Sequence, residues 1–400
     1  MEDIAYVASG STPEKSSFVP KGIPYIKMYN LRNQKIDFEY KPQYITAEIH
    51  NGKLQRSRTE VGDLIMNIVG PPLGKLAIIP PSLPQANFNQ AAVLIRPYLH
   101  KDNINVYLKA YLEEMSEINS ISTKGSAGQV NISLTQSQNM RIPLPPLPEI
   151  ERIIKNLKYW LSFVDNIEEN KEKLQDSIRQ VKSKVLDLAI HGKLVPQDPN
   201  DEPAIELLKR INPKAEIITD NGHYQKLPVG WCVCHINEIS ESLLGKTLDR
   251  TKDSGEFKRY VCAVNVQWGY FDFTTQKEFR IEAKDFERYA VKKGDLLICE
   301  GGDVGRCAIW DTDTEMYYQN ALHRVRCKFG ISEKYLQYSL WHFKLNGVID
   351  SLCKGVTIKH FTQSTMNKLE IPLPPFAEQQ RIVAKIEELF HQLDIIEESL

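Results

Sequence analysis

The sequence predicts an α+β protein in which two mixed α/β domains are separated by long helices that pair as a coiled coil. One observation is an internal repeat, because a shift of 229 positions aligns residues 142–171 with residues 371–400, with twelve identities. Another is the helical seam within each copy, and a third is the mixture of strand-like and helical segments upstream. A solenoid repeats every 20–50 residues or so, so this chain is better described as two copies of one large module.

The upstream parts of the two modules repeat more weakly. Gly10 matches Gly245, and the run Gly-Asp-Leu occurs at Gly62 and again at Gly294. Other matched pairs are Tyr25 and Tyr260, Asn30 and Asn265, Gly74 and Gly305, Lys75 and Arg306, and Lys124 and Lys354. Each module therefore has a globular part of roughly 140 residues, which is an ordinary domain size.

Short apolar runs bounded by Gly, Pro, Asn or Asp predict the strands of the globular parts. They lie at residues 63–68, 76–79, 91–95, 295–299 and 307–310. Aromatic and leucine residues at helical spacing predict helices at 106–118 and 333–348.

From Glu149 to Ile190 the chain contains neither glycine nor proline, and apolar residues recur three and four positions apart. This spacing predicts one long helix with a coiled-coil seam, interrupted by Lys171. Prolines precede the helix, and Gly192 is expected to cap its end. The seam residues expected to pack are Ile153, Leu157, Trp160, Val164, Ile167, Leu174 and Ile178 in the first helix and Ile382, Ile386, Leu389 and Leu393 in the second.

The second helix stops at Leu400, so in an antiparallel pair it would lie beside the far end of the first helix, near Ile190. Ile153, Leu157, Trp160 and Val164 are then expected to lack a partner within the chain. A naturally short second helix and a missing tail are both compatible with this pattern. Because exposed apolar stripes mark interaction sites, we expect a second copy or a partner protein to dock here.

The predicted division of the chain has five parts. Residues 1–141 and 227–370 are the globular domains, and residues 142–192 and 371–400 are the repeated regions. Residues 193–226 form a connector rich in Pro, Asp and Lys, with a short helix at 204–211.

Composition sets broad limits. The chain is 42% hydrophobic and 25% charged with a formal net charge of −1, which is typical of a globular protein. It has no apolar run long enough for a membrane span, so no membrane partner is expected. All seven cysteines follow residue 230, which favours free thiols in a reducing cytoplasm. Cys232 and Cys234 have no second ligand pair at zinc spacing, so no metal site is expected.

The motifs of enzymes that act on DNA are missing. Asn67–Pro72 and Gly301–Gly305 are the nearest strings to a methyltransferase motif and cofactor loop, but neither fits. Glu282-Ala283-Lys284 has the form of a nuclease motif, but the first module has no counterpart. There is no phosphate-binding lysine loop and no nucleophile elbow. No catalytic residue is therefore predicted.

Several motifs together resemble the specificity subunit of type I restriction–modification systems. The pattern Ile-Pro-Leu-Pro-Pro followed by Glu149 and Arg152 leads into the long helix, and its copy has Glu378 and Arg381. After the helix come Leu188–Gln197, then Asp201–Ala204, and Leu227-Pro228-x-Gly230-Trp231 opens the second module. The first module has no such opening. The resemblance covers essentially the whole chain, through the order and duplication of the motifs.

This resemblance implies a non-catalytic DNA reader. Each globular part would be a target recognition domain for one half of a bipartite site in double-stranded DNA. The two repeated helices would form an antiparallel coiled coil that sets the gap between the halves. The coiled coil would also dock methyltransferase subunits that methylate adenine, and a translocating restriction subunit would join them. S-adenosylmethionine, ATP and Mg²⁺ are expected only in those partners. The alternative is a stand-alone DNA-binding or scaffold protein without enzyme partners.

Candidate DNA-contacting residues combine cations near glycine turns with amides that could reach base edges. Lys75 and Arg306 are the most suggestive pair. Asn89 with Gln90, and Gln319 with Asn320, could bind adenine or could simply cap turns. The remaining candidates lie in glycine-containing loops and are Lys124, Gln129, Lys354 and Lys359.

Overall fold

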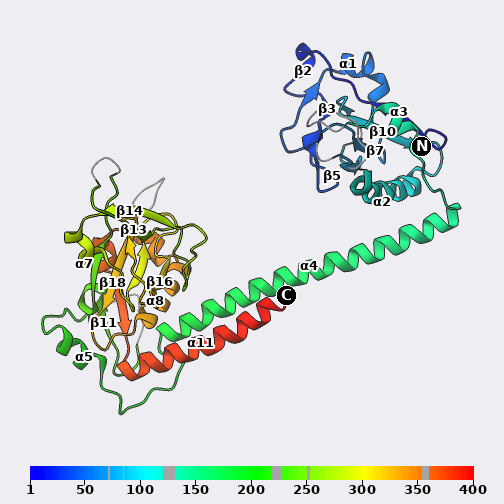
Figure 1. The fold of residues 1–400 in the computed structure, drawn as a ribbon. Coiled ribbons are helices and arrows are strands. Elements are labelled where there is room, and N and C mark those ends of the chain that lie inside the picture. The colour runs from blue at the N-terminus through cyan, green and yellow to red at the C-terminus, as the bar shows by residue number, and fades with distance from the viewer. Residues whose placement is uncertain (71–72, 84, 120–130, 219–226, 250–252, 354–359) are drawn as a thin grey trace. The chain divides into compact units, whose positions relative to one another are not determined.

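The chain forms two compact units in the computed structural model, residues 1–168 and residues 169–400 (Figure 1). The structure describes all residues except 71–72, 84, 120–130, 219–226, 250–252 and 354–359. Within the described ranges, no helix combines the length and the apolar character that crossing a membrane requires.

Unit 1 is built on an antiparallel sheet with the strand order β1-β10-β7-β8. Its strands are β1 (Ala5–Ser9), β10 (Ala92–Pro97), β7 (Leu64–Asn67) and β8 (Leu76–Ile78). Leu64 and Met66 face a core shared with α2 (Lys101–Asn119), whereas Ile65 faces a second core on the other side. Because β7 is buried on both faces, its first three residues, Leu64–Met66, are all apolar. The three predicted strands are confirmed, and the predicted helix at 106–118 starts earlier, at Lys101.

A second, smaller sheet of unit 1 has the order β2-β6-β3-β9. Its strands are β2 (Phe18–Val19), β6 (Tyr44–Ile45), β3 (Ile23–Ile26) and β9 (Asn87–Phe88), and β3 pairs with β9 in parallel. The hairpin β4 (Leu31–Arg32) and β5 (Lys35–Ile36) stands apart from this sheet. The short helices are α1 (Ala47–Asn51) and α3 (Leu134–Gln138), with 3₁₀ turns at Lys15–Ser17, Met28–Asn30 and Gln55–Ser57.

Unit 2 repeats this topology. Its main sheet has the order β12-β18-β15-β16, from β12 (Ser240–Leu244), β18 (Leu322–Cys327), β15 (Leu296–Cys299) and β16 (Cys307–Ile309). Each strand pairs antiparallel with its neighbour, as in unit 1. The second sheet has the order β14-β13-β17, and β13 (Glu256–Val261) pairs in parallel with β17 (Tyr317–Tyr318), as β3 does with β9. Its third strand is β14 (Lys277–Ile281). The structure thus confirms two copies of one module.

The helices of unit 2 lie around these sheets. They are α6 (Ile236–Ile239), α7 (Phe286–Tyr289), α8 (Glu333–Leu345), α9 (Val348–Leu352) and α10 (Gln363–Asn367), with a 3₁₀ turn at Ala283–Asp285. The predicted helix at 333–348 is interrupted because Gly347 has a φ of 72°, so a second short helix begins there. The connector helix α5 (Ala204–Ile211) forms where it was predicted, and Leu207 and Leu208 bury it in the core of unit 2.

The predicted long helix is α4 (Leu147–Ile190), a single helix of 44 residues. Its first turns belong to unit 1, where Ile150 and Ile154 enter the core beside Leu108. Its end is closed by Gly192 with a φ of 63°, while the Lys193 amide donates to the Leu188 carbonyl at 2.8 Å. This is the glycine C-cap that the sequence predicted.

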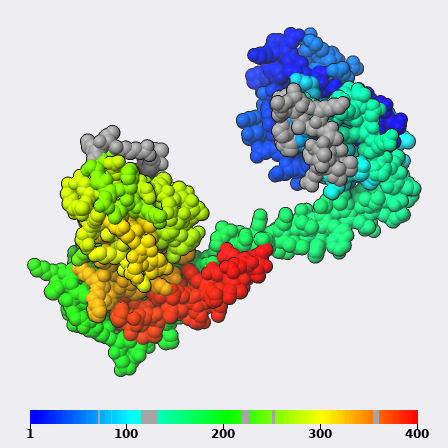
Figure 2. All heavy atoms as spheres, in the orientation of Figure 1, coloured from blue at the N-terminus to red at the C-terminus, as the bar shows by residue number. Residues whose placement is uncertain are grey.

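Within unit 2, α11 (Phe376–Glu398) runs antiparallel to the last half of α4, and the two helices lie side by side in both views (Figures 1 and 2). Lys182 Nζ contacts Asp394 at 2.6 Å and Glu397 at 2.9 Å, and Lys171 Nζ donates to the Leu400 carbonyl at 2.5 Å. Towards the other end of the pair, Ile190 and Ile382 share the core of unit 2. The predicted antiparallel coiled coil is confirmed.

The seam residues divide along the length of α4. Ile178, Ile382 and Ile386 are buried, and Leu157, Leu389 and Leu393 are half-buried. Ile153, Trp160, Val164, Ile167 and Leu174 are exposed, with Trp160 at 61%. Leu174 lies near the end of α11, where Lys171 contacts Leu400. Near unit 1, Ile150 and Ile154 rather than Ile153 are buried, because the domain core sets which face of the first turns is covered.

The two Ile-Pro-Leu-Pro-Pro segments take different structures. The second copy forms β19 (Glu370–Leu373), which pairs antiparallel with β11 (Cys232–His235), the first strand of the second module. The first copy forms no strand. The N-terminus contacts the chain just upstream instead, where the Met1 ammonium donates to the Met140 carbonyl at 2.7 Å.

Candidate nucleic-acid interface

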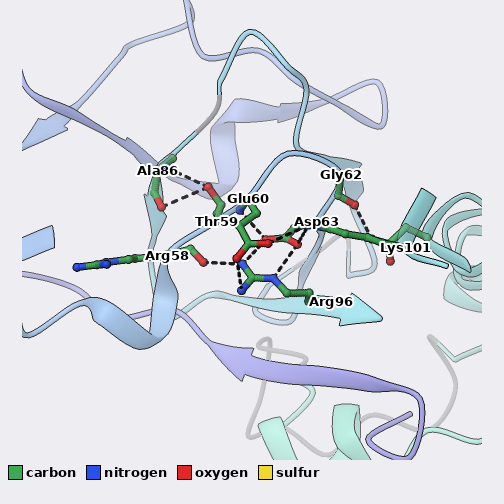
Figure 3. Close-up of polar contacts among 9 residues, drawn as sticks. Arg58, Thr59, Glu60, Gly62, Asp63, Ala86, Arg96 and Lys101 are labelled. Carbon is green, nitrogen blue, oxygen red and sulfur yellow. Dashed lines mark hydrogen bonds and ion pairs between the residues drawn. The ribbon is translucent and has the colours of Figure 1, made fainter. Parts of the chain in front are cut away.

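A buried ion pair anchors the main sheet of unit 1 (Figure 3). Asp63, which is fully buried at the start of β7, accepts from Arg96 Nε at 3.0 Å and from Arg96 Nη2 at 2.6 Å. Asp63 also contacts Lys101 Nζ at 2.7 Å and accepts from the Glu60 amide at 2.7 Å. The hydrogen bonds to Asp63 raise the pKa of the Arg96 guanidinium above its ordinary value, although burial opposes this. A bidentate pair of this kind fixes the neighbouring strands in register.

Unit 2 contains the same ion pair. Asp295 is buried and accepts from Arg326 Nε at 2.7 Å and from Arg326 Nη2 at 2.8 Å. It also accepts from the Lys292 amide at 2.7 Å, as Asp63 does from Glu60. The aspartate is the second residue of the repeated Gly-Asp-Leu run, so this part of the repeat encodes the anchor.

A close backbone approach also recurs in both units. A Cβ atom on Gly10 would lie 2.1 Å from the Asn89 carbonyl oxygen, and one on Gly245 would lie 2.2 Å from that of Gln319. The Asn89 amide donates to Ile26, and the Gln319 amide donates to Val261, both at 3.2 Å. Only glycine leaves room for this crossing. The turns that carry the candidate amides are therefore held by backbone contacts.

An exposed hairpin projects beside this framework in unit 1. Buried Asn30 holds its base, because its side chain donates to the carbonyls of Asp37 at 3.1 Å and Tyr40 at 2.8 Å and accepts from the Lys27 amide at 2.9 Å. At the tip, Asn33 and Gln34 have φ values of 48° and 55°, the combination that a two-residue hairpin turn needs.

The tip of this hairpin lies against the glycine turn that carries Lys75. Gln34 Oε1 accepts from the Leu76 amide at 2.7 Å, and a cavity of about 360 Å³ is lined by Leu31, Arg32, Asn33, Gln34 and Lys75. Arg32 lies over the Tyr40 ring at 4.3 Å, with Asp37 3.8 Å from its guanidinium. Among the described residues the Lys75 ammonium has no ion-pair partner. The tip therefore offers two cations and an amide to a phosphate backbone and a base edge.

Unit 2 has a matching hairpin at residues 266–271. Buried Asn265 donates to the carbonyls of Asp272 at 2.9 Å and Thr275 at 2.7 Å and accepts from the Cys262 amide at 3.0 Å. At the tip the Gly269 amide donates to the Cys307 carbonyl at 3.0 Å, so this hairpin also lies against the glycine turn.

The second tip differs in character from the first. Trp268 stacks on Trp341 with ring centroids 5.3 Å apart, and Tyr270 is exposed. Arg306 occupies the position of Lys75, but its Nη2 donates to the Ala263 carbonyl at 2.9 Å and its Nη1 lies 4.0 Å from Asp303. The two modules thus present different chemistry on the same backbone frame.

The other candidate residues are placed as follows. The Asn89 side-chain oxygen is buried and has no hydrogen-bond partner among the described residues, and Gln90 accepts from the Thr12 hydroxyl. Gln319 and Asn320 are half-buried in the corresponding turn. Lys124, Gln129, Lys354 and Lys359 lie outside the described residues. A role in DNA contact stays a prediction for all of these residues.

Sequence reasoning missed the residues that build the hairpins. Asn30 and Asn265 were matched between the modules, but their role as hairpin clamps was not inferred. Arg96 and Arg326, the partners of the buried aspartates, were not singled out at all. A buried asparagine and a strand arginine carry no local signature, and only the alignment of the two modules could have pointed to them.

The family model for the type I restriction modification DNA specificity domain matches residues 1–176 and 228–400. The two matched segments coincide with the two copies of the repeated fold, and the interval between them contains the end of α4 and the connector.

Similar curated proteins include specificity subunits from Escherichia coli. The type I restriction enzyme EcoEI specificity subunit is 24% identical over 69% of this chain and 58% of its own length. The EcoAI specificity subunit is 26% identical over 66% of this chain and 56% of its own length. The chain thus spans little more than half the length of these two relatives. The EcoBI specificity subunit is 24% identical over the whole chain and 80% of its own length.

Two solved structures share the fold across the whole chain and 90% of their own. One, from work on complex assembly and conformational transition of the type I R-M system, has a TM-score of 0.66 at 15% identity. The other, the HsdS subunit from Thermoanaerobacter tengcongensis, has a TM-score of 0.54 at 16% identity.

Proposed function

Because the chain belongs to the type I restriction modification DNA specificity family, we propose that it is the DNA-recognition subunit of a type I restriction–modification complex. Each recognition domain reads one half of a bipartite target in double-stranded DNA. The coiled coil of α4 and α11 sets the unread gap between the halves and docks the methyltransferase subunits. At ~1.5 Å per residue the 44 residues of α4 extend about 66 Å, the length of roughly two DNA turns of 34 Å each.

The observation that carries this proposal is the duplicated module. Both copies have the same main-sheet order, the same buried Asp–Arg anchor and the same asparagine-clamped hairpin. The hairpin tips carry different side chains, with Arg32, Asn33 and Lys75 in one and Trp268 and Tyr270 in the other. Two domains with the same backbone framework and different side chains at the hairpin tips are suited to binding two half-sites of different sequence.

The chain itself is proposed to be non-catalytic. Methyl transfer from S-adenosylmethionine to adenine belongs to the methyltransferase subunits, and ATP- and Mg²⁺-dependent translocation and cleavage belong to the restriction subunits. The complex acts on chromosomal and incoming DNA, which places it in the prokaryotic cytoplasm. The exposed seam residues of α4, including Trp160 and Val164, are proposed to contact a methyltransferase subunit or a second copy.

Methylome sequencing of the host with and without the gene tests the proposal. We expect one split, adenine-methylated motif to disappear on deletion and to return on complementation. The purified chain alone is expected to transfer no methyl group to DNA. If the deletion leaves every methylated motif in place while the chain still binds specific DNA, the stand-alone DNA-binding alternative replaces this proposal.

The Lys75→Ala variant tests the first hairpin tip. Removing one phosphate contact reduces the slope of log K against log[salt] by about 0.9, and we expect affinity to fall roughly three- to tenfold for all sequences. The complex of the chain with its methyltransferase subunits is titrated with target and non-target duplexes over a range of salt concentrations.

Two matched variants sharpen this test. Arg306→Ala is expected to change DNA affinity less and to lower stability, since the Arg306 guanidinium already binds the Ala263 carbonyl. Lys53→Ala removes an exposed lysine of the same unit that pairs with Glu14 at 3.1 Å, and it is expected to leave the salt slope unchanged. An unchanged slope in Lys75→Ala would place the DNA elsewhere on unit 1.

A further inference from the structure

Three potential metal ligands converge within unit 2 where α4 ends. Asp187 lies in the last turn of α4, His191 follows its last residue, and His342 lies in the last turn of α8. One ligand atom from each lies within 4.8 Å of the others. Asp187 and His191 are four residues apart, which places both on one side of the helix end.

The two imidazoles are suited to metal binding. His191 Nδ1 lies 2.8 Å from the Asp187 backbone carbonyl, so Nδ1 carries the proton and the lone pair of the neutral ring is on Nε2. Histidine ligands of metals are commonly oriented by a hydrogen bond of this kind. His342 is buried, and burial lowers its pKa to about 4, with a smaller opposing effect from Asp187 and a reinforcing one from His191. The neutral ring is the form that ligates metals.

The surroundings leave room for further ligands. A cavity of about 370 Å³ is lined by the three residues together with Asn346, Ser351 and Glu370. This volume can hold water molecules that complete a coordination shell. In a tetrahedral zinc site, bonds of 2.0–2.2 Å put ligand atoms about 3.4 Å apart. The ligand atoms of the three residues lie within 4.8 Å of one another, so the side chains must rotate inward to reach that value.

The contacts already present do not prevent binding. Lys184 Nζ lies 2.7 Å from Asp187 Oδ2, and His191 Nδ1 lies 3.2 Å from Asp187 Oδ1. The carboxylate therefore has a separate neighbour at each oxygen. The Asn346 amide nitrogen lies 3.1 Å from His342 Nδ1 and 3.3 Å from His342 Nε2, and it also donates to the His342 carbonyl at 3.1 Å. The bond to the carbonyl satisfies this amide when a metal ion takes a ring nitrogen.

We propose that Asp187, His191 and His342 bind one divalent transition-metal ion, with Zn²⁺ the best match, which joins the end of α4 to α8. Two imidazoles and one carboxylate suit zinc-like ions and not Mg²⁺ or Ca²⁺, which take oxygen ligands. Sequence analysis did not predict this site, because His342 is far along the chain from Asp187 and His191. The proposal does not depend on the proposed function.

Metal titration of the full chain tests it. The chelator-treated, desalted protein is titrated with Zn²⁺ by calorimetry and with Co²⁺ by visible absorption, and thermal unfolding is followed with each ion. We expect one site per chain, a cobalt spectrum of nitrogen and oxygen ligands, and a rise in Tm that saturates with the same affinity. Mg²⁺ and Ca²⁺ at equal concentration are expected to give neither signal.

Variants locate the ion. His191→Gln, Asp187→Asn and His342→Gln are each expected to weaken binding at least tenfold, whereas His391→Gln, at an exposed position on α11, is expected to leave it unchanged. If the buried His342→Gln variant fails to fold, the half-exposed His191→Gln variant decides. The absence of a stoichiometric site, or binding unaffected by these variants, overturns the proposal. Charge-transfer absorption typical of cobalt–thiolate bonds also overturns it, since the ion would then be on one of the seven free cysteines.

Discussion

Replacing Asp63 with alanine is expected to cost unit 1 about 3–5 kcal/mol of unfolding free energy, which is a large part of the roughly 5–15 kcal/mol that keeps a domain folded. The change leaves the Arg96 guanidinium without its bidentate partner and Lys101 without its 2.7 Å contact. It also removes the acceptor of the Glu60 amide. A half-buried charge that loses its partner while the surrounding sheet stays packed is the costly case.

Hydrogen exchange on the full chain measures this effect unit by unit. Peptides from β7 and β10 are expected to lose protection in Asp63→Ala, while those from β15 and β18 keep it. Asp295→Ala is expected to give the reverse pattern, because Asp295 holds Arg326 in the same geometry.

Glu60→Gln is the matched control for the buried pair. Glu60 contacts Arg96 Nη1 at 2.9 Å, but its side chain is 56% exposed, so the loss is expected to stay below about 1 kcal/mol. If Asp63→Ala lost as little unfolding free energy as Glu60→Gln, the buried Asp63–Arg96 pair would not be the anchor of the module.

Under the proposed function, exchanging unit 1 for the corresponding domain of a known specificity subunit is expected to change one half of the methylated target completely. The other half and the gap between the halves should be retained, because unit 2 carries its own frame and hairpin. The methylated motif in cells that carry the chimaera reports the result. A simultaneous change in both halves would contradict two independent readers.

The position of the junction in the chimaera provides an internal control. Ile150 and Ile154 of α4 pack in the core of unit 1, and the Tyr107 hydroxyl donates to the Pro143 carbonyl at 2.7 Å. A junction after residue 141 joins a foreign core to these side chains, and we expect it to lose about 1–3 kcal/mol through imperfect packing. A junction after residue 157 transfers these contacts together with the foreign domain. This chimaera is expected to recognise the same new half-site and to be more stable than the chimaera joined after residue 141.

The sequence alone was enough to predict the duplicated module, the long helix and the pairing of the two helical seams, whereas the antiparallel direction came from the family resemblance. These features depend on local or periodic signals. Glycine and proline mark the ends of α4, three- and four-residue spacing marks its seam, and a direct repeat needs only comparison of the chain with itself. The strands at 63–68 and 295–299 were predictable because each contains an unbroken apolar run, Leu64–Met66 and Leu296–Cys299, that is buried on both faces.

The contacts that each side chain makes could be found only from the tertiary structure. Lys75 and Arg306 occupy equivalent turns, yet Arg306 binds the Ala263 carbonyl whereas Lys75 lies at a hairpin tip. Asn30 and Asn265 clamp hairpins through carbonyls seven and ten residues away, and Asp63 meets Arg96 across 33 positions. His342 meets Asp187 and His191 only because α8 packs near the end of α4. Such partnerships depend on where the backbone brings distant residues together. These contacts depend on how the core of each unit packs, and the spacing of residues along the chain carries no signal for them.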